Sequence, residues 1–154
     1  MRWLVILGVL AGLGFCVYRF AFASSEAYQT YSRFADAMLY DRWDDARDLA
    51  SGDGVKEAID ENESIPASIG YERYRQLRGV VHGSPWRTIE SETSSDDGRT
   101  VTLQVVQDVR RGSVTMSPIG PATVRYLHEV VMVKTDDGWK VEEFEEAVEP
   151  LSDR

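Results

Sequence analysis

The chain divides into an apolar segment and a longer segment in which polar and apolar positions alternate regularly. Residues 3 to 23 are apolar apart from Arg19. A helix rises about 1.5 Å per residue, so about 20 residues cross the hydrocarbon core of a bilayer. The pattern predicts a transmembrane anchor within residues 1 to 25 and one extracytoplasmic domain over residues 26 to 154.

Hydrophobic positions at helical spacing occupy the first part of this domain. Apolar residues three and four apart between Glu26 and Tyr40 predict an amphipathic helix. Asp41 suits the cap of a second helix, and a third short helix is expected over Val55 to Asn62. A helical turn is expected at Tyr71 to Arg78, where Gly79 ends it.

From Trp86 onward the spacing changes to the alternation that is typical of β-strands. Strands are predicted over residues 86–93, 101–109, 124–135 and 139–146. Asp-Gly pairs at residues 97–98 and 137–138 predict tight turns, because this pair accepts a positive φ. The fold class is therefore α+β, with two to four helices packed on one face of an antiparallel sheet of about four strands; the resemblance described below implies that this sheet is curved.

The apolar segment has a second interpretation as a secretory signal. Ala21-Phe22-Ala23 resembles a cleavage site, so secretion after cleavage near Ala23 is the alternative to anchoring. Arg19 and the bulky aromatic residues before that site favour the uncleaved anchor. Gly8 and Gly12 form a GxxxG pattern, which lets two membrane helices pack closely and suggests a homodimer.

Composition and charge narrow the classes of function. Residues 26 to 154 contain 15 basic and 26 acidic residues, a net charge of −11. Such a surface repels nucleic acid and anionic lipid headgroups. Arg outnumbers Lys by 14 to 3, which favours a bacterial gene and hence an inner-membrane protein whose domain faces the periplasm or the cell exterior. The sole cysteine is Cys16, so the domain itself has no disulfide.

His128 is the main candidate for a site. Alternation along its strand places it on one face with Tyr126, Val130 and Met132, the more apolar face, which the resemblance described below implies is the concave side of the sheet. Burial and a nearby carboxylate tune such a histidine for proton transfer; the alternative is a hydrogen-bonded core histidine. Helical spacing turns Asp36 towards solvent, which removes it as a partner.

Other chemistry has little support. The two histidines, His82 and His128, are far apart and lack the spacing of metal ligands. Motifs for a nucleophile, a nucleotide or a dinucleotide are absent from the sequence. The acidic run from Glu142 to Glu149 indicates a solvated edge, or alternatively a surface for a basic partner. We predict no catalytic residue, no metal and no cofactor.

The connection between residues 110 and 122 is long for a hairpin. It opens with Arg110 and Arg111 in an otherwise acidic domain, and Met116 and Ile119 give it an apolar tip. Loops of this length are often functional. We interpret it as a candidate docking loop.

The order of these elements resembles the nuclear-transport-factor-2-like superfamily. The stretch Phe34-Ala35-Asp36-Ala37-Met38-Leu39-Tyr40-Asp41-Arg42-Trp43-Asp44-Asp45-Ala46 and the strand Asp137-Gly138-Trp139-Lys140-Val141 carry the resemblance. It implies a cone-shaped domain over residues 25 to 149, and in particular a small membrane-anchored bacterial member. Members include enzymes, small-molecule binders and protein-binding subunits, so the fold does not give the function.

Three functions are therefore expected in order. The first is a non-catalytic membrane-anchored domain that acts by protein contacts in an envelope assembly, with another envelope protein or itself as partner. The second is a module whose cone pocket binds a small molecule or peptide. The third is an isomerase- or hydrolase-like enzyme that uses His128, for which a carboxylate within hydrogen-bond reach is the discriminating feature.

Overall fold

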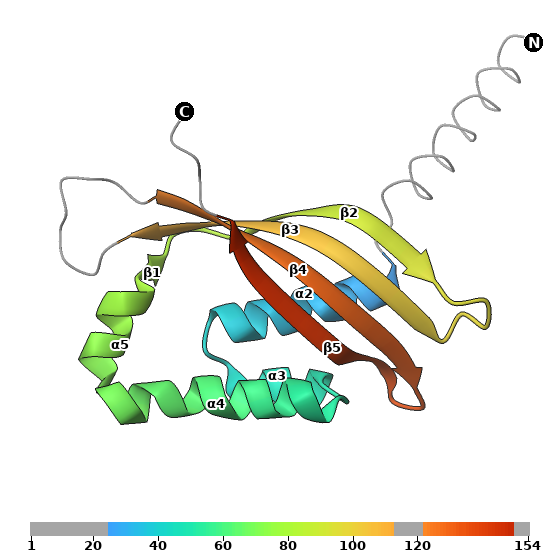
Figure 1. Ribbon diagram of the computed structural model, residues 1–154, viewed down its shortest axis with the longest axis horizontal. Helices are drawn as coiled ribbons and strands as arrows, with labels where there is room; N and C mark the ends of the chain where they lie inside the picture. The colour runs from blue at the N-terminus through green and yellow to red at the C-terminus, as the bar shows by residue number, and fades with distance from the viewer. Residues whose placement is uncertain (1–24, 113–121, 150–154) are drawn as a thin grey trace, which may run out of the picture.

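The protein is α+β, with four helices packed on a curled antiparallel half-barrel sheet (Figure 1). The computed structural model describes residues 25–112 and 122–149. Its helices are α2 (Glu26–Leu39), α3 (Trp43–Leu49), α4 (Asp53–Ile69) and α5 (Tyr71–Arg78). Its strands are β1 (Val80–Val81), β2 (Trp86–Ser94), β3 (Thr100–Gly112), β4 (Ala122–Thr135) and β5 (Gly138–Glu149). The expected fold class is confirmed at this level.

Helix α2 forms because its sequence supplies both a cap and one apolar stripe. The Ser25 hydroxyl accepts a hydrogen bond from the Tyr28 backbone N–H at 3.1 Å, which satisfies one of the free donors at the helix start. Tyr31 and Phe34 are fully buried on the stripe that faces the sheet. Burying each such side chain contributes about 1.5–3 kcal/mol, so tertiary packing holds this helix in place.

Two expectations for the following helices were wrong. Asp41 does not cap α3, whose first residue follows Arg42 without a side-chain cap; Asp41 has a φ of 58°, which aspartate tolerates. Its carboxylate instead pairs with Arg78 at 2.5 Å. Helix α4 is also longer than the expected short helix, because it continues through Pro66 to Ile69.

The sheet is built around β3, the strand with the most partners. The strand order is β1-β3-β4-β5, and β2 also pairs with β3, all of them antiparallel. Two register shifts mark irregular positions of the kind that bend strands. One lies in β2 between Ile89 and Ser91, and the other lies in β5, where Glu142 is the extra residue opposite Val131 and Met132 of β4. The turns at Gly98 and Gly138 have positive φ, as the Asp-Gly pairs predict.

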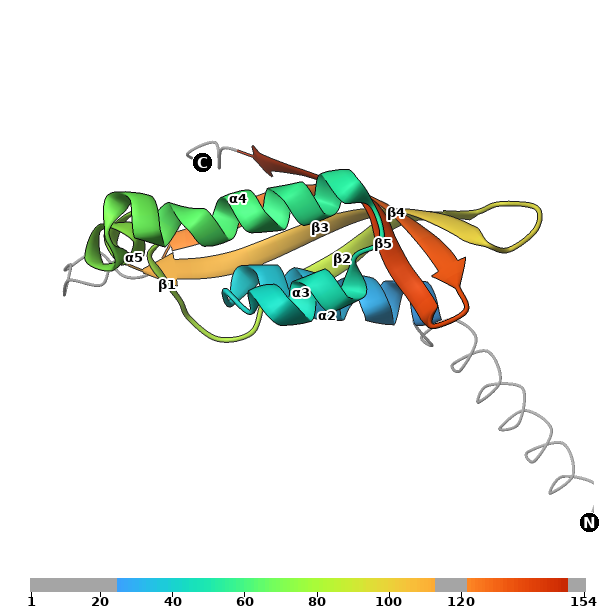
Figure 2. The same cartoon turned by 90° about the horizontal axis from the view of Figure 1, so that it is seen from below.

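The helices cover only the concave face of the sheet. Figures 1 and 2 show α2, α3 and α4 on the same side, and no described element covers the opposite face. A core of buried side chains fills the space between them; its largest members are Tyr31, Phe34, Ile59, Leu103, Val105, Val130, Met132 and Val141. The backbone N–H groups of Ser51 and Gly52 bond to the Val141 carbonyl at 2.8 and 3.3 Å, which ties the start of α4 to β5.

The predicted anchor, residues 1 to 24 with Gly8 and Gly12, lies outside the described residues. Among the residues that are described, no helix combines the length and the apolar character needed to cross a bilayer.

Candidate functional site

The inner face of the sheet changes from apolar to polar along its length. Odd-numbered residues of β3 face inward and are apolar from Val101 to Val105, whereas the next three at the same spacing are Gln107, the buried Val109 and Arg111. On β4 the same change runs from Met132 and Val130 to His128 and Tyr126. Register places these polar residues side by side, because Gln107 pairs with Tyr126. The sequence therefore builds a polar patch inside a curved sheet.

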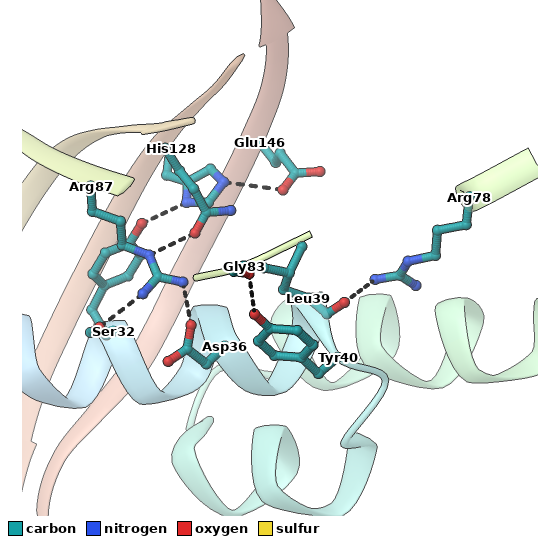
Figure 3. A network of polar contacts seen from close by, with 11 residues as sticks. Ser32, Asp36, Leu39, Tyr40, Arg78, Gly83, Arg87, His128 and Glu146 are labelled. Atoms are coloured by element: carbon teal, nitrogen blue, oxygen red, sulfur yellow. Dashed lines mark hydrogen bonds and ion pairs between the residues drawn. The ribbon is translucent and has the colours of Figure 1, made fainter. Parts of the chain in front are cut away.

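His128 lies at the centre of this patch. Its side chain is 2% exposed, and both of its ring nitrogens have partners. The Tyr31 hydroxyl lies 2.6 Å from Nδ1, and the Glu146 carboxylate lies 3.1 Å from Nε2. Figure 3 shows His128 and Glu146 reaching towards each other from neighbouring strands. The Phe144 ring packs edge-on against the imidazole at 5.0 Å.

Burial fixes the protonation state of Tyr31, the first residue of the hydrogen-bonded series Tyr31–His128–Glu146. It raises the pKa of the Tyr31 hydroxyl well above its usual range, although the charge of Arg87 partly opposes the effect. Tyr31 therefore keeps its proton and is a donor at neutral pH. The arrangement is satisfied when Tyr31 donates to Nδ1 and the Nε2–H of His128 donates to Glu146. The side chain of Glu146 is 44% exposed, so Glu146 is the residue of this hydrogen-bonded series that reaches solvent.

A second network joins α2 to the same patch. The guanidinium of Arg87, on β2, donates to Gln107 at 2.6 Å, to Ser32 at 3.0 Å and to Asp36 at 2.6 Å (Figure 3). The Arg87 side chain is only 8% exposed, so this ion pair is shielded from water. Asp36 is therefore half-buried and paired, and the expectation that it faces solvent was wrong.

Between the polar patch and the helices lies a cavity of about 530 Å³. Its walls are mainly apolar on the helix side, where Asn62, Tyr74 and Arg78 are polar, and mainly polar on the sheet side. The helices and β5 contribute the apolar side chains Met38, Trp43, Ile65, Ile69, Leu77 and Phe144. The sheet contributes Gln107, Arg111, Tyr126, His128 and Glu146. An apolar enclosure with a few convergent polar groups is the usual makeup of a small-molecule site, and the volume falls within the usual range of about 300–1,000 Å³.

Arg78 holds one wall of the cavity in place. Its guanidinium donates to the carbonyls of Met38 and Leu39 at 2.7 and 3.3 Å, at the end of α2 where carbonyls lack helical partners. It also contacts the Tyr74 hydroxyl and pairs with Asp41. Because these partners occupy Arg78, its role is to fix α5 against the end of α2.

The residues expected at the site fall into three places. His128 and Tyr126 line the cavity, whereas Val130 and Met132 are fully buried in the core and do not line it. Arg110 and Arg111 do not belong to a loop, because β3 runs through them to Gly112. Arg110 is exposed, while Arg111 lines the cavity. Met116 and Ile119 lie outside the described residues.

Sequence reasoning missed three residues of the site: Tyr31, Gln107 and Glu146. Glu146 belongs to the acidic run that was interpreted as a solvated edge, yet alternation along β5 turns it inward beside His128. Counting by two along β3 from Val101 leads to Gln107, so a polar residue at a core position was the available signal. The helical stripe that contains Tyr31 gave no signal, because a buried tyrosine is ordinary in such a position.

The described residues hold no cluster of three His, Cys, Asp or Glu side chains that could bind a metal ion. No protein-family model, curated protein or solved structure matches the chain. The function is therefore argued from the geometry of the cavity.

Proposed function

We propose that this domain is a non-catalytic binding module whose cavity holds a small molecule or the side chains of a peptide. The cavity carries the proposal: it is roomy, mainly apolar on the helix side and mainly polar on the sheet side. On the order of its elements we also propose that the domain is a nuclear-transport-factor-2-like member, held at a bacterial membrane by residues 3 to 23.

The hydrogen bonds of His128 favour binding over catalysis. A general base needs a free nitrogen within reach of the substrate, and both nitrogens of His128 already have partners. The carboxylate that an enzyme would need is present, since Glu146 lies 3.1 Å from Nε2. An isomerase- or hydrolase-like activity would therefore use Glu146 as the exposed acid or base, with His128 positioning it. This is the enzymatic alternative.

A cavity-filling substitution tests the binding proposal. Ala58 and Ala67 both lie on α4 and are both exposed, but Ala58 lines the cavity and Ala67 does not. We expect ligands from a panel of lipids and metabolites to raise the melting temperature of the wild-type chain and of Ala67→Trp, but not that of Ala58→Trp. A panel in which no compound shifts the wild type, or shifts all three proteins equally, would refute the proposal.

A second function, protein contact within an envelope assembly, has support from the uncovered face of the sheet. Trp86 is 74% exposed and Leu127 is 42% exposed on that face. Their neighbours Glu90, Glu129 and Glu145 border a hollow there, which suits a partner with basic side chains. This partner is another envelope protein or a second copy of the chain.

Capture from membranes tests the second function. The full chain would be tagged, crosslinked in native membranes, purified and analysed by mass spectrometry. We expect Leu127→Arg to lose one stoichiometric partner that the wild type retains. Tyr71→Arg, an equally polar change at the 63% exposed Tyr71 on α5, should retain it. Equal capture by both variants would argue against contact through this face.

A further inference from the structure

Arg111 differs from the other partly buried arginines of the described chain. Arg47, Arg78, Arg87 and Arg125 each form an ion pair with an Asp or Glu side chain. Arg111 is half-buried as well, but no carboxylate of the described residues lies within ion-pair distance of it. A charge partly removed from water without a counter-ion is costly, so this arrangement suits an anionic ligand.

The contacts of Arg111 hold its guanidinium in place without neutralising it. Its Nη1 donates to the Arg78 carbonyl at 2.8 Å, and its central carbon lies 5.7 Å from the centre of the Tyr126 ring. Its Nε is buried and, among the described residues, has no hydrogen-bond partner. The nine residues that follow Gly112 contain no Asp or Glu.

The other charged side chains of the cavity are already paired. Arg78 has Asp41, and Glu146 is hydrogen bonded by His128. Among the described residues, Arg111 is therefore the charged side chain of the cavity wall that is left to form an ion pair with a ligand. The apolar side chains across the cavity, such as Trp43, Ile65 and Leu77, suit a hydrocarbon tail.

We propose that the ligand of this cavity is an amphipathic organic anion, whose head group pairs with Arg111 and whose aliphatic tail packs against α4 and α5. This inference rests on the binding function proposed above. A planar guanidinium with two adjacent donors matches a carboxylate or a phosphate monoester, which are the two forms of the head group.

The test compares charged and neutral probes of equal chain length. The full chain in lipid nanodiscs would be titrated with octanoate, octyl phosphate and 1-octanol, with tryptophan fluorescence as the signal and empty nanodiscs as the blank. Trp43 lies in the cavity wall and reports on occupancy. The variants are Arg111→Met, Arg111→Lys and, as a control, Arg110→Met, which removes an exposed charge next along the strand.

We expect Arg111→Met to weaken binding of the preferred anionic probe by about 10- to 100-fold, the range of a charge-assisted hydrogen bond. Binding of 1-octanol should be unchanged, and Arg110→Met should match the wild type. Arg111→Lys should retain only part of the affinity, because an ammonium keeps the charge but not the two-donor geometry. The tighter of the two anions identifies the head group. Octanol binding without any preference for anions, or an equal loss for all probes, would overturn this inference and leave the binding function intact. Failure of every probe to bind would overturn both.

Discussion

Replacing Arg87 with methionine should destabilise the fold by about 2–4 kcal/mol. The substitution keeps an unbranched apolar stem but removes all three hydrogen bonds to Gln107, Ser32 and Asp36. Gln107 is 2% exposed, so its amide oxygen is left unpaired away from water, which costs about 1–3 kcal/mol. The side chain of Asp36 is 35% exposed and can be hydrated again in the variant, so the loss of its ion pair adds less to the destabilisation.

Arg125→Met is the matched control for this change. Arg125 also forms a two-pronged pair with an aspartate, Asp108, at 2.8 and 3.2 Å, but its side chain is 41% exposed. A pair in that setting contributes about 0–1 kcal/mol. Urea unfolding of the full chain in a mild non-ionic detergent, followed by far-UV circular dichroism, measures both. A loss in Arg87→Met no greater than that in Arg125→Met would refute the role given to burial.

A double-mutant cycle separates the unpaired oxygen from other effects. Adding Gln107→Met to Arg87→Met replaces both partners by apolar groups, which is close to neutral when the shape is kept. We expect the double variant to be at least about 1 kcal/mol more stable than the sum of the two single losses predicts. Strict additivity would show that the Arg87–Gln107 bond contributes little.

Two further predictions concern backbone packing and pH. Gly52→Ala should destabilise by about 1–3 kcal/mol or more, because its added Cβ would lie 1.8 Å from the Glu142 carbonyl oxygen; Gly54→Ala, with nothing within 4 Å, should be neutral or stabilising in the same urea assay. Burial raises the pKa of the Tyr31 hydroxyl, so the unfolded chain loses this proton at a lower pH than the folded chain does. The contribution of Tyr31 to the free energy of unfolding should therefore be level from pH 7 to about 10 and then fall by up to about 1.4 kcal/mol per pH unit. Tyr31→Phe should make that alkaline fall shallower, and an unchanged slope would contradict the assignment.

The sheet could be predicted from the sequence because its signals are local. Alternating apolar positions and the Asp-Gly turns at Gly98 and Gly138 define β3, β4 and β5 within a few residues. The two-residue strand β1 has too few residues to show a period. The extent of α4 could not be predicted, because Pro66 removes a backbone donor and normally ends a helix. Its continuation brings Ile65 and Ile69 to the cavity.

Only part of the candidate site could be predicted from the sequence. His128 and Tyr126 follow from alternation on one strand, but Tyr31 and Glu146 reach His128 from sequence distances of 97 and 18 residues. Such partners depend on the register of the sheet and on where α2 crosses it, which no local pattern encodes. The same reason explains Arg111. Its charge suggested a docking loop, but the pairing of β3 continues three residues beyond the expected end, through Gly112, and makes Arg111 part of the cavity wall.

Native mass spectrometry of the full chain, released from its own membranes, tests the binding function most directly. We predict that the wild-type chain and Ala67→Trp carry the additional mass of one small amphipathic acid, and that Ala58→Trp, in which the cavity is filled, does not. A wild-type spectrum without any retained ligand, or the same retained mass in all three proteins, would contradict the account.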